Sequence, residues 1–523
     1  MKVDVDQPMQ VPEPHAVLPL TVFDRLYDRT TFVIGWVVEG QIDSAALEGA
    51  LTRVTRKWRA LAGRIESVKN KETQWCLRIP IADMTQTFPT FTLTSTTSET
   101  PLSKCVPNLD ETAESTPFVL CPTDATLNHL FIHDSTPLSY AAFESRVHPL
   151  TCWHLTHFPA SLSEHVRAYT CVGFARCGIF DDEGASLVLH ALAAEMRSAP
   201  WAVPPIPDWG VNDNPLQRAL GRDARRYYLP LPGHKEYAGF STLGFFQAYK
   251  MIFWHLWQKG TKGAEPKTQR VHRSRVQEVL EETRRGLQEK GYANLPVRDS
   301  DILFSWIIKT LCGSRDEILF RGTKDRKIHF NIFASFRHLF GTPGSSESLE
   351  NYPFNASAPL PCPPITYEEA CAFSLPDIAR LLAVWRLTFS RRHVQSAYET
   401  LQRSVRAYPF DPTSDETLTM ADLAECRFGE MDWSGIGGHV TLGMARFHLT
   451  PDDFMWTNTI CILDKLSDGS VLLDTVLGGQ RLSRLESKIM ESRPEKVLEN
   501  SAAKLQQGAN EGITEHETGV SSR

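Results

Sequence analysis

The run AYTCVGFARCGIFDDEGASLVLHALAAEM (168–196) decides the fold, because it holds a strand, a tight turn and a helix in direct succession. Ala168–Phe174 is an apolar, strand-like segment. The helix predicted over Gly184–Met196 is apolar on nearly every side, so it should be buried in a core. Asp181 and Asp182 precede it and are expected to cap its N-terminus, where the helix dipole favours acids.

The same alternation of strands and helices continues on both sides of this run. Thr31–Val38 is an apolar, β-branched run that predicts a buried strand. Asp43 or Ser44 can cap a helix that Gly63 ends. Further predicted elements are the helices Ser274–Lys290 and Asp299–Leu311 and the strands Lys327–Phe336, Asn458–Leu463 and Ser470–Val476. Strands and helices in both halves predict two α/β domains.

Proline marks the expected boundary between these domains. Seven prolines punctuate residues 199–236, where neither helical nor strand periodicity survives, so this stretch is predicted to be a crossover linker. The N-terminal domain should then span residues 1–198 and the C-terminal domain residues 237–491. Residues 492–523 are polar and are expected to be disordered.

Composition excludes several classes of protein. The chain has 523 residues, of which 42% are hydrophobic, which is ordinary for a protein with a real core. Its net charge of −7 speaks against a basic surface for binding nucleic acid. The 11 cysteines contain no CxxC pair, which speaks against a zinc ribbon or a disulfide framework and fits a reducing compartment. Residues 1–20 lack the apolar core of a secretory signal, so a cytoplasmic location is expected.

The most lipid-like stretch is LGFFQAYKMIFWHLW (Leu243–Trp257). It is too short and too polar to span a membrane, because Gln247, Lys250 and His255 interrupt it. A buried helix is the favoured interpretation, and contact with a membrane surface is the alternative.

Standard catalytic signatures are missing from the sequence. It contains no GxxxxGK[ST], no GxGxxG after a strand, no HExxH and no GxSxG. No metal site and no nicotinamide site is visible. The one literal HxxxD string is His448–Asp452, and about one such string is expected by chance in a chain with 17 histidines.

A distributed set of motifs is more informative than any single string. In chain order the set is LPLTVFDRLY (18–27), KWRALAGRI (57–65), CGIFDDEGASLVLHAL (177–192), RDSDILFSWIIK (298–309), NIFASFRHLF (331–340), ENYPFNAS (350–357), DWSGIGG (432–438) and ICILDKLSDGSVLLDTVLGGQRLSRLE (460–486). In order and spacing this set resembles the BAHD acyltransferases, especially the branch similar to trichothecene O-acetyltransferases. The resemblance covers residues 18–490.

The resemblance implies two similar chloramphenicol-acetyltransferase-like α/β domains with a central channel between them. An acyl-CoA co-substrate and a small-molecule acceptor would meet in that channel, and the family is usually monomeric. In the family signature HxxxDG, the His deprotonates the acceptor, while the Asp pairs with an Arg and fixes the turn. The second signature, DFGWG, is mainly structural.

This chain departs from the family pattern at the catalytic position. Asp181 falls on the motif Asp and Cys177 on the motif His, so the signature reads CxxxD. In the second signature, Asp432 and Trp433 match, but Ser434 stands where Gly is usual. These two matching residues should hold a turn and pack, without chemistry.

A thiol is a poor substitute for the imidazole, because it is shorter and mostly protonated at neutral pH. Three readings remain open. Cys177 could be a nucleophile, its pKa lowered by Arg176 and the following helix N-terminus. Another base, such as His190, His154 or His157, could replace it. The scaffold could instead have left acyl transfer for a cyclisation, dehydration or isomerisation, or for binding alone.

The favoured interpretation is an acyl-CoA-dependent O-acyltransferase that tailors a secondary metabolite, in a pathway similar to those of mycotoxins. Cys177 would occupy the catalytic position, and its sulfur would face the channel between the domains. His190 lies in an apolar helix, where a core position is the alternative to a base. Arg337 is the candidate partner of Asp181, and Gly184 should allow close helix–strand approach.

Overall fold

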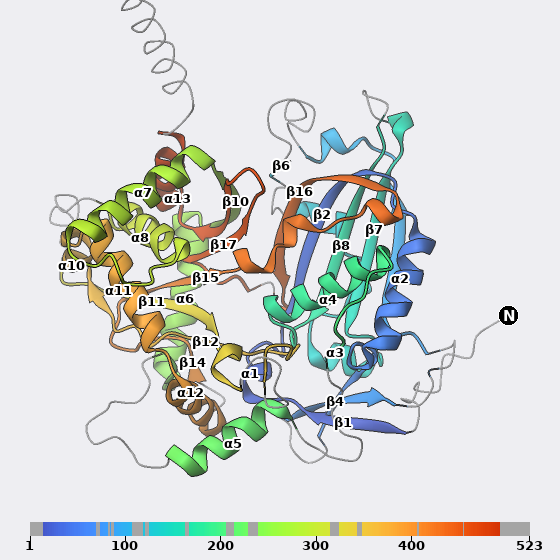
Figure 1. Ribbon diagram of the computed structural model, residues 1–523, viewed down its shortest axis with the longest axis horizontal. Coiled ribbons are helices and arrows are strands. Elements are labelled where there is room, and N and C mark those ends of the chain that lie inside the picture. Colours follow the sequence, from blue (N-terminus) through green and yellow to red (C-terminus); the bar gives the residue numbers. More distant parts are fainter. Residues whose placement is uncertain are drawn as a thin grey trace, which may run out of the picture.

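A computed structural model describes residues 14–491 except 69–73, 82–83, 85–87, 107–118, 121–124, 163–166, 205–213, 228–238, 314–323, 342–347, 405–406 and 453. Two lobes, each built on one large mixed sheet, stand side by side (Figure 1). The N-terminal lobe holds the blue to teal part of the chain together with the orange strand β16 (Gly438–Leu449), and the C-terminal lobe holds most of the green to red part. The expected α/β class with two sheet-based domains is confirmed.

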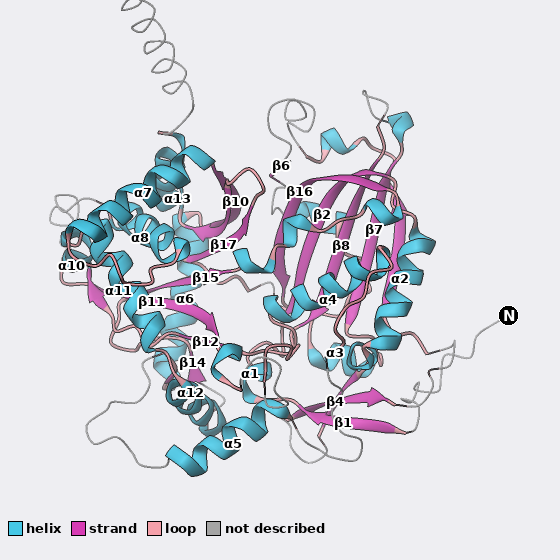
Figure 2. Ribbon diagram, viewed as in Figure 1, coloured by secondary structure: helices cyan, strands magenta, loops and turns pink. Residues whose placement is uncertain are grey.

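The N-terminal lobe is organised around a six-stranded sheet in the order β5-β7-β8-β2-β16-β6. The strands are β5 (Thr92–Thr97), β7 (Thr151–Phe158), β8 (Tyr169–Cys177), β2 (Thr31–Gly40), β16 (Gly438–Leu449) and β6 (Val119–Leu120), and a smaller sheet joins β1 (His15–Pro19), β4 (Trp75–Pro80) and β3 (Arg64–Ser67). Its helices are α1 (Val22–Arg25), α2 (Ser44–Lys57), α3 (Tyr140–Ser145) and α4 (Asp182–Met196). Figure 2 shows α2 and α4, which pack against each other, lying across the large sheet.

The C-terminal lobe holds the second large sheet, in the order β10-β18-β17-β15-β11-β12 with β13 also on β11. Its strands are β10 (Glu265–Val271), β18 (Val471–Leu477), β17 (Thr459–Lys465), β15 (Glu416–Asp422), β11 (Lys327–Ser335), β12 (Ser357–Pro359) and β13 (Ile365–Thr366), and β9 (Ser241–Thr242) pairs with β14 (Ala407–Tyr408). Its helices are α6 (Phe245–Lys262), α7 (Arg273–Glu289), α8 (Asp299–Cys312), α10 (Tyr367–Ala372), α11 (Leu375–Thr388), α12 (Arg391–Arg403) and α13 (Gly479–Met490). The helices α7, α8 and α11 pack together as one layer.

Two features differ from the expected domain boundaries. The strand β16 comes from the predicted C-terminal domain, residues 237–491, yet it pairs along its length with β2 in the sheet of the other lobe. The predicted linker, residues 199–236, contains a helix, α5 (Pro215–Tyr227), which begins with its proline at the first helical position. Residues 205–213 and 228–236 of that linker, and the expected tail 492–523, lie outside the described residues.

Local sequence signals predict the elements of the core well. Asp43 caps α2 by accepting hydrogen bonds from the backbone of Ala45 and Ala46, as expected. The helix ends at Lys57, and a short 3₁₀ turn carries the chain on to Gly63. The predicted strands and helices elsewhere agree with the structure to within about three residues at each end.

Candidate active site

A cavity of about 1620 Å³ opens between the two lobes. The N-terminal lobe lines it with the loop after α1, residues 25–30, and with the first turn of α4, residues 181–183. The C-terminal lobe lines it with residues of β11, β15, β17 and β18. The strand β16 crosses between the lobes and contributes Arg446 and His448. The cavity is therefore a feature of the paired lobes and not of either one alone.

The turn before α4 contains Asp181, which forms the predicted ion pair with Arg337. Asp181 caps α4 by accepting a hydrogen bond from the backbone N–H of Gly184 at 2.8 Å. Both of its carboxylate oxygens accept from the guanidinium of Arg337, at 2.6 and 3.0 Å. Two parallel charge-assisted hydrogen bonds of this kind are strong and fix geometry. The expected partnership of these two residues is present in the structure.

Arg337 joins this turn to a loop of the C-terminal lobe. It also donates to the carbonyls of Tyr352 at 2.9 Å and Phe354 at 2.7 Å, both in the YPFNA segment. A Cβ on Gly184 would lie 1.9 Å from the carbonyl oxygen of Pro353 in the same segment. Gly184 therefore allows close approach, as expected, but its neighbour is this loop and not a strand.

The expected position of the Cys177 sulfur in the channel is wrong. The side chain is fully buried and does not line the cavity. The groups that interact with it electrostatically include Cys152, Asp24 and Tyr140 in the core of the N-terminal lobe. Burial raises the pKa of the Cys177 thiol well above its ordinary value, so the thiolate that a nucleophile needs is disfavoured.

Strand alternation explains this burial. Successive side chains of a strand point to opposite faces of its sheet. In β8, Arg176 is in register with Phe32 of β2 and, through it, with His448 of β16. Phe32 and His448 line the cavity, so this rung faces it. Cys177 is one residue further along and therefore points to the opposite face of the sheet.

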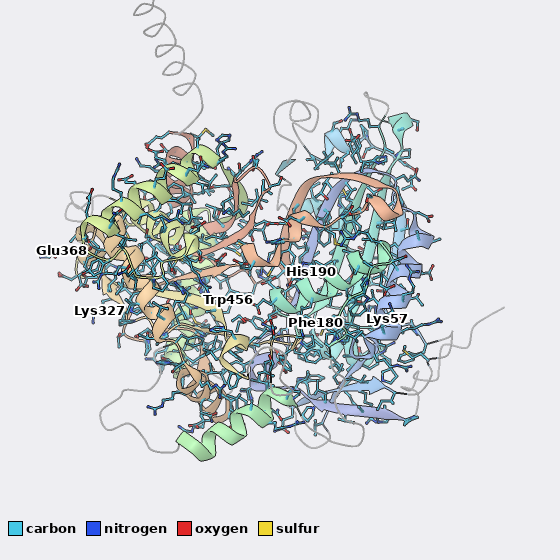
Figure 3. The ribbon with its side chains drawn as sticks, viewed as in Figure 1. Lys57, Phe180, His190, Lys327, Glu368 and Trp456 are labelled. Atoms are coloured by element: carbon cyan, nitrogen blue, oxygen red, sulfur yellow. The ribbon has the colours of Figure 1, made fainter. Side chains whose placement is uncertain are left out.

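The histidines expected to replace Cys177 do not line the cavity either. His154 and His157 are buried in β7, where they hydrogen-bond to threonines, His154 with Thr94 at 2.7 Å and His157 with Thr170 at 3.4 Å. His190, the candidate base whose alternative is a core position, is exposed on α4, on the N-terminal lobe in Figure 3. None of these three imidazoles is therefore a candidate base in this cavity.

A chain of alternating charges, which the sequence did not single out, runs from the buried Arg176 to three residues that line the cavity, Asp182, Arg446 and Asp474. Arg176 donates to Asp182 at 2.5 Å, and Asp182 also accepts from Arg446 at 2.9 Å. Beyond it, Asp474 of β18 lies 3.9 Å from Arg446, so the chain connects the two lobes. Burial alone would raise the pKa of Asp182, but Arg446 and Arg176 outweigh it and lower that pKa.

Within this row of charged residues, Asp474 has the carboxyl group whose pKa is raised. Burial raises its pKa to about 6, and the attraction of Arg446 offsets only part of that rise. A carboxyl poised near neutral pH in a cavity wall is a candidate general base. A signal was present in the sequence, since Asp474 is the one charged residue in the otherwise apolar run VLLDTVL (471–477).

Among the described residues, three histidines line the cavity, namely His255, His338 and His448. Nδ1 of His255 accepts a hydrogen bond from the backbone N–H of Thr457 at 3.1 Å, and burial lowers the pKa of this imidazole to about 4. It is therefore neutral at physiological pH. His448 belongs to the literal HxxxD string, but Asp452 of that string pairs with Arg29, and β16 leads into no helix there.

The second signature lies away from the cavity. Asp432 accepts from the backbone N–H of Ser434 at 2.9 Å and pairs with Arg197 at 3.6 Å. Trp433 is buried edge-on against Trp36, with ring centroids 5.4 Å apart. Neither Asp432 nor Trp433 lines the cavity. In the part of the chain that the structure describes, no cluster of three metal-ligating side chains is found.

Comparison with known proteins identifies the fold. No protein-family model and no curated sequence matches the chain. The chain is similar to the crystal structure of F. graminearum TRI101 complexed with coenzyme A and deoxynivalenol, with a TM-score of 0.57, 14% identity, and coverage of 90% of this chain and 97% of that one. It is also similar to vinorine synthase, with a TM-score of 0.51, 13% identity, and coverage of 91% and 93%.

A third structure with this fold is the epimerization domain from the third module of tyrocidine synthetase B, with a TM-score of 0.50, 11% identity, and coverage of 93% and 97%. At these identities the likeness establishes architecture and leaves the chemistry open. The two-lobed fold that the motifs led us to expect is confirmed over nine-tenths of the chain.

Proposed function

We propose that the chain transfers an acyl group from acyl-CoA to a hydroxyl group of a small molecule held in the cavity between the lobes, with His448 as the general base. The observation that carries the proposal is the imidazole of His448 on the cavity side of the sheet. His448 lies two strands away from Arg176 on the same rung, which is about 10 Å at ordinary strand spacing. The cavity wall thus holds an imidazole two strands away from the end of β8, while Cys177 is buried in the core.

In the proposed reaction, the His448 imidazole takes the proton of the acceptor hydroxyl as its oxygen attacks the thioester carbonyl. The tetrahedral intermediate then collapses, the carbon–sulfur bond breaks, and the imidazolium returns the proton to the departing CoA thiolate. The structure of TRI101 with coenzyme A and deoxynivalenol supports the pairing of CoA with a small molecule in this fold. Tailoring of a secondary metabolite is part of the same proposal.

The phosphates of CoA need cations at the edge of the cavity. Arg29 and Lys465 line the cavity, and more than half of each side chain is exposed. Both pair with exposed acids, Asp452 and Asp299, so a phosphate could displace these partners at small cost. We expect Lys465→Glu to weaken CoA binding and to leave binding of the acceptor unchanged.

The proposal is tested by CoA binding and by CoA release with a panel of hydroxylated acceptors. His448→Gln should lower acyl transfer by roughly 10²–10⁴-fold without weakening CoA binding. His338→Gln is the matched control, because His338 also lines the cavity but has no assigned role and should retain activity. Absence of any CoA-induced rise in melting temperature, or equal activity of the two variants, would refute acyl transfer through His448.

A second candidate function is proton transfer on a bound metabolite, an isomerisation without CoA. It is favoured by the raised pKa of Asp474 beside Arg446, and by the epimerization domain among the proteins with this fold. Here Asp474→Asn, and not His448→Gln, would abolish turnover. Exchange of a substrate hydrogen with deuterated water, in the absence of CoA, would distinguish this reaction from acyl transfer.

A further inference from the structure

The helix α6 exposes an apolar stripe on the outside of the C-terminal lobe. The stripe consists of large side chains that are 41–86% exposed: Phe245, Phe246, Tyr249, Ile252, Phe253 and Leu256. Trp257 continues it at 39% exposure. Single exposed apolar residues are ordinary on protein surfaces, but a contiguous set on one helix is not. The expectation that this segment is a buried helix is therefore wrong.

The opposite side of α6 is anchored to the body of the lobe. Met251 and His255 are buried there and line the cavity. His255 hydrogen-bonds to Thr457 and lies edge-on to Trp456, with ring centroids 4.9 Å apart. Figure 3 places Trp456 on the C-terminal lobe. The helix thus has one face fixed in the protein and the apolar stripe turned outward.

Charge along α6 complements an anionic surface. Residues 245–262 contain no Asp or Glu, whereas the whole chain carries a net charge of −7. At about 100° per residue, the stripe covers an arc of roughly 140° around the helix. Lys250 and Lys259 fall just outside its two edges, and Lys262 reaches back over the ring of Trp257 at 4.9 Å. An apolar stripe bordered by lysines and rich in Phe and Trp is typical of helices that lie in a membrane interface.

We propose that α6 docks this face of the protein on an anionic lipid bilayer, with the helix lying in the plane of the interface. The phenylalanines and Leu256 would enter the boundary between head groups and acyl chains, while the lysines contact lipid phosphates. No described helix is long and apolar enough to cross a membrane, so the contact is peripheral. Because the inner side of α6 lines the cavity, docking brings a wall of the cavity next to the lipid surface.

Vesicle flotation with the full chain tests the proposal. The wild-type protein should float with phosphatidylcholine vesicles that contain roughly 30% phosphatidylserine, and less with pure phosphatidylcholine. Phe246→Ser/Phe253→Ser should lower the floating fraction on the order of tenfold. Lys250→Glu/Lys259→Glu should remove the preference for phosphatidylserine. The stripe residues are largely outside the core, so circular dichroism and melting temperature should match the wild type.

The matched control is Leu387→Ser/Met490→Ser, which removes two exposed apolar side chains, 49% and 56% exposed, from α11 and α13. This variant should float like the wild type. The proposal is overturned if the wild-type protein does not float, or if the α6 and control variants behave alike. It is also overturned if light scattering finds a wild-type dimer that Phe246→Ser/Phe253→Ser dissociates while neither protein floats, because the stripe would then bind a second copy.

Discussion

Cys177 and Asp181 lie four residues apart, at the two ends of the turn from β8 to α4, and the structure holds them in different ways. Asp181 is held by two hydrogen bonds from Arg337 and caps α4, so the turn has the bracing that the resemblance implies. Cys177, at the end of the preceding strand, points into the core behind the sheet. The ion pair that holds the turn is therefore present in a protein whose motif position, Cys177, has no access to the cavity.

The difference follows from how each position is held. Asp181 acts through charge, and its partners come from the other lobe, so the turn also fastens the lobes together. Cys177 is held by packing, because its side chain is fully buried in the core of the N-terminal lobe. The ion pair between Asp181 and Arg337 can persist without a catalytic group next to it, because the pair stabilises the turn and the contact between the lobes by itself.

Removing the ion pair between Asp181 and Arg337 should have the largest effect on stability. Arg337→Ala leaves the mostly buried Asp181 with backbone N–H donors from Gly184 and Ala356 but without its cation, and breaking a buried ion pair destabilises by roughly 3–5 kcal/mol. Denaturant unfolding measures the free energy of unfolding. Arg403→Ala, which removes a surface pair with Glu399, is the control and should cost at most about 0.5 kcal/mol. Equal losses in the two variants would show that the turn is not a brace.

Restoring the family motif at Cys177 should destabilise the protein without creating activity. An imidazole is larger than the thiol, and the site is fully buried, so Cys177→His should lower the free energy of unfolding by about 1–3 kcal/mol. Its imidazole would still point away from the cavity. A gain of acyl transfer in this variant would show that residue 177 can reach the substrate, contrary to our account.

A smaller, pH-dependent effect is expected at Asp474. Its pKa in the folded protein is about 6, above that of an unfolded aspartate, so the folded state holds a proton that the unfolded state has lost between about pH 4 and pH 6. Wild-type stability should therefore fall over this interval relative to Asp474→Asn, and the difference should stay constant above it. The total change should be about 1–3 kcal/mol. Parallel unfolding curves of the two proteins over this interval would contradict the assignment.

The sequence predicts local structure better than orientation. The cap at Asp43 and the partnership of Asp181 with Arg337 follow from signals near those residues or from the motif set. The face on which Cys177 lies was not predictable, because every residue of β8 is buried and no alternation of polar and apolar residues separates its two sides. The pairing of β16 with β2 joins residues about 400 positions apart, and no local pattern encodes it.

Other misses have similar causes. His190 is surrounded by apolar neighbours in sequence, yet α4 leaves that one position exposed. The segment that forms α6 is apolar enough for a core, and only its tertiary setting shows that one side is outside. Asp474 and His448 are both polar residues in strands, and each could have been noticed from the sequence. Both line one cavity because β16 leaves the C-terminal part of the chain and pairs with β2 of the other lobe, which no local pattern predicts.

The central claim is that the Cys177 thiol is sealed from the cavity, and chemical labelling of the native protein tests it most directly. The protein is incubated with acetyl-CoA or with N-ethylmaleimide, digested, and the peptide that contains Cys177 is analysed by mass spectrometry. We predict no acetyl group and no maleimide on Cys177 until denaturant unfolds the chain. Rapid modification of Cys177 in the folded protein would contradict the account.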